Sequence, residues 1–88
     1  MKHAGPATLA ALEPLLCRLR QRDALKEKTP GAFYLKSAAF LHFHEDVSGT
    51  FADVKLDDVN FTRLRATTAD EQAGLLARID AFLAPSKR

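Results

Sequence analysis

The chain has few of the residues that mark specialised classes of protein. Among its 88 residues there is one cysteine and no tryptophan, so an internal disulfide is excluded. The formal net charge is only +2, whereas a nucleic-acid-binding module usually carries a much stronger positive charge. No apolar run approaches the roughly 20 residues that a membrane-spanning helix needs. We therefore expect neither a nucleic acid nor a membrane as the partner.

The N-terminal stretch MKHAGPATLA lacks the long apolar segment of a secretory signal. Together with the lone Cys17, which suits a reducing compartment, this predicts a soluble cytoplasmic protein. A hydrophobic content of 47% is enough for a single core but leaves little room for a deep active site. We predict one domain over residues 1–88, with residues 1–7 and 85–88 disordered.

The run from Phe33 to Leu56 is where apolar and polar residues alternate with the two-residue period of paired strands. An acidic pair, a serine and a glycine interrupt the run at residues 45–50, as a hairpin turn does. If Glu45 lies opposite Thr50, one face of the hairpin is aliphatic and the other mixes aromatic, imidazole and charged groups. A shift of one residue would destroy this separation. The register pairs Leu41 with Val54, His42 with Asp53, Phe43 with Ala52, His44 with Phe51, and Phe40 with Lys55.

Amphipathic helices are predicted on either side of this sheet in the sequence. Leucines recur at spacings of three and four and predict a helix over about 13–25, with Pro14 in its first turn. A second helix is predicted over about 69–83, where Thr68 and Glu71 have the spacing of a capping box. Short strands over 33–36 and 61–66 complete a sheet of three or four strands within residues 33–66.

These elements predict an α+β fold, a two-layer sandwich in the order helix, antiparallel sheet, helix, with both helices on the aliphatic sheet face. The opposite face stays open. Exposed aromatic rings among polar groups are typical of a contact surface for a protein or a small ligand. Burial of the same rings in a homodimer is the alternative, so the chain is predicted to be a monomer or a homodimer. The predicted binding surface consists of Tyr34, Lys36, Phe40, His42, His44, Phe51, Asp53 and Lys55.

One cluster on this surface suggests chemistry. His42 and His44 alternate on a strand, so their imidazoles project together about 7 Å apart, and Asp53 lies opposite His42. Two nitrogens and a carboxylate form a donor set for a divalent metal or for acid–base catalysis, although an ordinary cross-strand pair accounts for the same pattern. A nucleophile is missing, because Cys17 lies beside the leucine stripe and is interpreted as buried. We therefore favour a non-catalytic binding module that requires no cofactor, with the metal or acid–base site as the alternative.

Three segments resemble a group of small uncharacterised bacterial proteins, a domain of unknown function. They are Leu25–Ser37, Phe40–Asp46 and Phe51–Leu56, and the first presents a Pro-x-x-Phe-Tyr-x-Lys strand before the hairpin. The resemblance implies this fold and a bacterial cytoplasm, and no activity. It also implies that Pro30–Lys36 and the His-Phe-His-Glu-Asp run form one surface.

Overall fold

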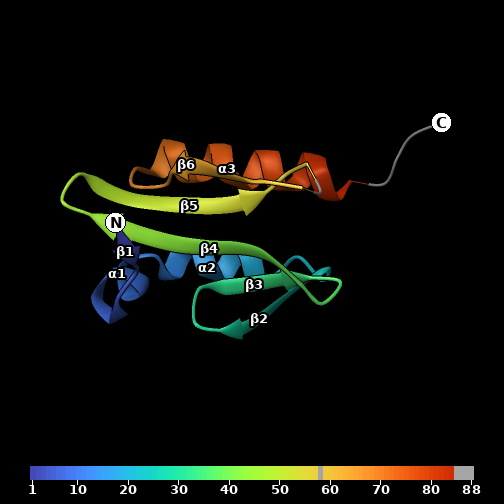
Figure 1. Ribbon diagram of the computed structural model, residues 1–88, viewed down its shortest axis with the longest axis horizontal. Coiled ribbons are helices and arrows are strands. Elements are labelled where there is room, and N and C mark those ends of the chain that lie inside the picture. The colour runs from blue at the N-terminus through green and yellow to red at the C-terminus, as the bar shows by residue number, and fades with distance from the viewer. Residues whose placement is uncertain (58, 85–88) are drawn as a thin grey trace.

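The computed structural model describes residues 1–57 and 59–84 and has a mixed α+β architecture (Figure 1). In chain order the elements are β1 (Lys2–His3), α1 (Pro6–Ala11), α2 (Glu13–Arg20), β2 (Leu25–Thr29), β3 (Ala32–Leu35), β4 (Ala38–Asp46), β5 (Gly49–Lys55), β6 (Phe61–Arg65) and α3 (Ala69–Leu83). The strands form one antiparallel sheet in the order β2-β3-β4-β5-β6, and β1 pairs with β4. The prediction of three or four strands is wrong, because the sheet has six strands within the described residues, where three helices replace the predicted two.

The hairpin of β4 and β5 is the centre of the sheet, and its predicted register is confirmed for every pair except Phe40 with Lys55. Leu41 lies opposite Val54, His42 opposite Asp53, Phe43 opposite Ala52, His44 opposite Phe51, and Glu45 opposite Thr50. The aliphatic face is the buried one, since Leu41, Ala52 and Val54 are all at most 1% exposed. In Figure 1, β4 runs through the middle of the molecule between β5 and β3.

The helices pack against this aliphatic face. Leucines of α2 and the apolar stripe of α3 join the sheet residues in one core cluster. The guanidinium of Arg22, just after α2, donates two hydrogen bonds of 2.9 and 2.8 Å to the carboxylate of Asp80 in α3, which ties the two helical segments together. α3 begins at the predicted capping box, in which Thr68 and Glu71 bond to each other's backbone N–H groups. Cys17 is exposed, so its interpretation as a buried residue is wrong.

β2 lies where a helix end and a loop were expected. α2 ends at Arg20, and Leu25–Thr29 forms an edge strand that pairs with β3 across a turn at Pro30 and Gly31. Gly31 has a φ of 77°, and a type II turn requires a positive φ at this position and commonly has proline before it. Charged residues fill the remainder of β2, and such residues on an edge strand discourage pairing with other chains. Because of that role, β2 lacks the apolar alternation by which a strand is recognised in a sequence.

The structure places the first residues in regular elements, where the sequence predicted disorder over 1–7. Lys2 and His3 form β1 opposite Glu45 and His44. The carboxylate of Glu45 then accepts hydrogen bonds from the Gly5 N–H at 2.6 Å and from the Thr8 hydroxyl at 2.7 Å. Glu45 thereby anchors the start of α1 to β4. The predicted disorder of residues 85–88 lies outside the described residues.

Phe40 does not face Lys55 on the open side of the sheet, and this part of the prediction is wrong. Phe33 pairs with Leu41 while Tyr34 pairs with Ala39, so Phe40 is an extra residue in β4. Such a bulge changes the direction of a side chain. Phe40 is only 2% exposed and stacks on Phe82 of α3, with 5.8 Å between ring centroids.

Candidate functional site

The face of the sheet opposite the core carries no helix in the part of the chain that the structure describes. Six of the eight residues predicted for this surface lie on it: Tyr34, His42, His44, Phe51, Asp53 and Lys55. Of the other two, Phe40 is in the core, and Lys36 lies in the turn between β3 and β4. β6 adds Phe61, Arg63 and Arg65 opposite Lys55, Asp53 and Phe51. We call this surface the open face.

Three aromatic rings on the open face each carry a cation. The Lys28 Nζ lies 4.6 Å from the ring centroid of Tyr34. The corresponding distances are 5.2 Å from Lys55 Nζ to the Phe61 ring and 5.6 Å from Arg65 Cζ to the Phe51 ring. Each pair is within the range of a cation–π interaction, which holds the cation over an apolar surface.

Asp53 is the centre of the polar part of the open face. Its residue exposure is 7%, and Arg63 donates two hydrogen bonds to the carboxylate, from Nε to Oδ1 at 2.7 Å and from Nη2 to Oδ2 at 2.8 Å. The hydrogen bonds from Arg63 lower the pKa of Asp53 more than burial raises it, so the carboxylate is ionised. This charge-assisted fork fixes the direction of the carboxylate.

Each of two imidazoles has a nitrogen close to one oxygen of that carboxylate. His44 Nδ1 lies 3.2 Å from Asp53 Oδ2, and His42 Nε2 lies 3.6 Å from the same atom. Burial lowers the pKa of both histidines, and the attraction of Asp53 only partly offsets this effect. Both imidazoles are therefore held neutral near neutral pH.

A third histidine, His3, joins this cluster and was missed by sequence reasoning. It lies opposite His44 in the β1–β4 pair, and its ring stacks on that of His44 with 4.4 Å between centroids. A strand of two residues has no periodicity that a sequence pattern can reveal. The indication that the sequence does contain is its composition: the chain has three histidines, and the other two are predicted to lie in the cluster.

A pocket of about 380 Å³ opens beside the cluster, where β1 and β3 meet the same edge of β4. His3, His42 and Tyr34 line it, together with the turn at Pro30 and Gly31. The Pro30 segment and the histidine-bearing strand thus share one concave surface.

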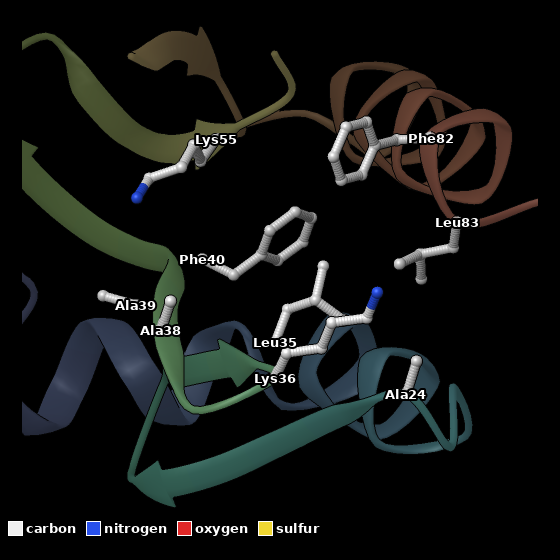
Figure 2. Close-up of a pocket in the computed structure, with 9 residues that line it drawn as sticks. All are labelled: Ala24, Leu35, Lys36, Ala38, Ala39, Phe40, Lys55, Phe82 and Leu83. Atoms are coloured by element: carbon white, nitrogen blue, oxygen red, sulfur yellow. The ribbon is translucent and has the colours of Figure 1, made fainter. Parts of the chain in front are cut away.

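A second pocket, of about 580 Å³, lies between the β3–β4 hairpin and the C-terminal end of α3. Figure 2 shows Phe40 pointing from β4 toward Phe82, with Leu35 and Leu83 beside them. Lys36 and Lys55 also line this pocket. It is therefore an apolar hollow with two primary amines around it, and Lys55 connects it to the open face.

Comparisons with protein-family models, with curated proteins and with solved structures found no match to this chain. The resemblance to small bacterial proteins stays a prediction. Among the described residues, no helix combines the length and the apolar character that crossing a membrane requires.

Proposed function

We propose that this chain is a non-catalytic binding module whose open face captures an acidic segment of a partner protein. The observation that carries the proposal is the set of three aromatic rings that each hold a cation, on β3, β5 and β6. An acidic segment with apolar side chains would meet both charge and apolar surface at each of these positions.

The charge of the open face supports an anionic partner. Five basic residues lie on it, namely Lys26, Lys28, Lys55, Arg63 and Arg65. The acidic groups that act on them are Asp53, which Arg63 neutralises, Glu71, whose Oε2 lies 3.2 Å from Arg65 Nε, and Asp46 near the hairpin turn. The three lysines on this face are therefore the cations that an acidic segment would meet first.

The positions of the cations favour a peptide over a single-stranded nucleic acid. Nucleic-acid platforms use the exposed faces of aromatic rings to stack bases. Here a lysine or an arginine lies over each ring, so a base would have to displace it. Carboxylates reach the same cations without displacing them.

The pocket beside Phe40 supports a partner with apolar side chains as well as acidic ones. Its walls are apolar at Leu35, Phe40 and Phe82, and Lys55 lies both beside the pocket and over the Phe61 ring. An apolar side chain seated there would keep its neighbouring carboxylates close to Lys36 and Lys55. Buried apolar anchors of this kind contribute most of the affinity in protein interfaces.

The proposal does not include catalysis. Cys17 is on α2, and the hydroxyl of Ser48 donates a hydrogen bond to Asp46 in the hairpin turn at 2.6 Å. Neither belongs to the imidazole cluster. The proposed setting is the reducing cytoplasm that a lone cysteine suits, with the module acting as a monomer or a homodimer.

The test is an NMR titration of labelled protein with a short peptide of alternating glutamate and leucine. We expect saturable shifts of the amides of Tyr34, Phe51 and Phe61. A peptide with glutamine in place of every glutamate is the matched control and should cause no such shifts. Binding by both peptides would contradict the proposal that charge attracts the partner. Tighter binding of an oligothymidylate of matched length would show that the partner is a nucleic acid and not an acidic peptide.

Two variants separate loss of binding from loss of folding. Phe51→Ser removes a ring from the open face and should abolish the peptide-induced shifts while the protein keeps its dispersed spectrum. Val47→Ser, at an exposed position in the hairpin turn, should bind as the natural sequence does. Unchanged binding by Phe51→Ser would overturn the assignment of the surface.

A further inference from the structure

The imidazole cluster contains a buried nitrogen without a hydrogen-bond partner. His44 Nδ1 is inaccessible to solvent and is the only such atom among the side chains that the structure describes. It lies 3.2 Å from Asp53 Oδ2, yet the two atoms are not aligned for a hydrogen bond. An unpaired buried polar atom is destabilising, and binding an ion is one of the ways in which such an atom is satisfied.

The donor atoms around this nitrogen have the spacing of a metal site. His42, His44 and Asp53 each offer one donor atom, and these three atoms lie within 4.8 Å of one another. The nitrogens that lie beside Asp53 Oδ2 are His42 Nε2 and His44 Nδ1. Ligands bound about 2.0–2.1 Å from a tetrahedral Zn²⁺ are separated by about 3.3 Å. The distances from Asp53 Oδ2 to the two nitrogens, 3.6 and 3.2 Å, are close to that separation.

We propose that His42 Nε2, His44 Nδ1 and Asp53 Oδ2 bind a divalent first-row transition-metal ion of the zinc class, with His3 as a fourth ligand. The ring of His3 is centred 4.4 Å from that of His44 and 6.0 Å from that of His42. Its side chain is exposed, so a change of rotamer that turns a ring nitrogen toward the ion would meet solvent and not the core. The bound ion would therefore connect β1, β4 and β5.

The donor atoms decide which metals the site accepts, and Arg63 lies beside them on Asp53. An ionised carboxylate has about four lone-pair positions, so Asp53 Oδ2 can accept from Arg63 Nη2 and still bind an ion. The guanidinium charge nevertheless opposes a cation beside it. Mg²⁺ and Ca²⁺ depend on oxygen ligands and are disfavoured here, whereas imidazole nitrogens suit Zn²⁺, Ni²⁺ and Cu²⁺.

The first test observes the imidazole nitrogens of the natural sequence directly by NMR during titration with Zn²⁺, without any peptide. All three histidines of the chain belong to the cluster, so every imidazole signal reports on it. We expect His42 Nε2 and His44 Nδ1 to shift and to saturate at one ion per chain, and Mg²⁺ to cause no change. Absence of these shifts, or saturation only at several ions per chain, would overturn the site.

The variants then assign the ligands. His42→Gln and His44→Gln should each weaken Zn²⁺ binding by more than about tenfold, and His3→Gln should weaken it less, since three ligands remain. Asp46→Asn removes a carboxylate that lies on the same face but outside the cluster, and this variant should bind Zn²⁺ as the natural sequence does. Undiminished binding by His42→Gln and His44→Gln would contradict the proposal. If these variants fail to fold, the nitrogen shifts of the natural sequence decide the question.

Discussion

At the scale of single residues, the bulge in β4 makes Phe40 part of the core. We predict that Phe40→Ala lowers the free energy of unfolding by about 3–5 kcal/mol, because it removes a buried ring that stacks on Phe82. Urea denaturation followed by circular dichroism measures this change. Phe61→Ala is the control and should cost less than about 1 kcal/mol, because Phe61 is 41% exposed. Equal losses in the two variants would show that Phe40 is not buried in solution.

The pH dependence of stability is also a property of single residues. Burial holds the pKa of His42 and His44 below the ordinary value of 6.5, so the unfolded chain binds protons first as the pH falls. In metal-free buffer, the free energy of unfolding is fully retained above about pH 6.5 and decreases toward the lowered pKa values. His3, Asp53 and Arg63 are the charged or titratable groups that act on these histidines.

Urea denaturation at a series of pH values tests this dependence. The double variant His42→Gln, His44→Gln should show a much smaller decrease between pH 7 and pH 5, whatever its absolute stability. The double variant should still lose stability at lower pH. Arg63 lowers the pKa of Asp53, so the ionised carboxylate stabilises the fold, and this contribution is lost as the carboxylate is protonated. An unchanged slope between pH 7 and pH 5 would mean that the two histidines are not buried as described.

The candidate site was partly predictable from single residues. Alternation along a strand places His42, His44 and Asp53 on one face without knowledge of the remaining fold. The alternation fails at Phe40, because a bulge inserts one extra residue into β4. The bulge follows from the short turn before β4, and a two-residue period in the sequence does not encode it. His3 depends on pairing across about 40 residues of sequence, so no local pattern marks it.

At the scale of elements, the turn between β3 and β4 is strained. Lys36 and Ser37 have φ values of 51° and 71°, a conformation that costs ordinary residues roughly 1–2 kcal/mol each. We predict that Lys36→Asn combined with Ser37→Gly raises the free energy of unfolding by about 1 kcal/mol, because asparagine and glycine suit a two-residue hairpin with positive φ. Thermal and urea denaturation measure the gain.

The neighbouring turn provides the opposite test. Gly31 also has a positive φ, and a Cβ there would lie 2.6 Å from Leu9 Cδ2. Gly31→Ala should therefore lower stability by more than about 1 kcal/mol. A loss of stability in the Lys36 and Ser37 double variant would indicate that the two residues do not hold these angles in solution.

Elements differ in how far the sequence determines them. α3 has an amphipathic stripe, a capping box and a terminal proline in the sequence, and it spans the predicted residues 69–83. β1 and β2 have none of these signals. They exist because β4 and β3 offer free edges to which they hydrogen-bond, and this stabilisation arises only in the folded chain. Tertiary pairing thus extends the sheet from the predicted three or four strands to six.

At the scale of the whole molecule, the distribution of charge should decide binding. Lys28→Glu and Arg18→Glu each lower the net charge by two, from +2 to 0, but Lys28 lies over Tyr34 on the open face and Arg18 is on α2. Lys28→Glu should weaken binding of the glutamate–leucine peptide at least tenfold, and Arg18→Glu should leave it nearly unchanged.

Charges act over about 10 Å at 0.1 M salt and about 3 Å at 1 M, so the difference between the two variants should vanish at high salt. Fluorescence anisotropy of the labelled peptide measures both effects. Equal weakening by the two variants would show that total charge, and not the open face, attracts the peptide.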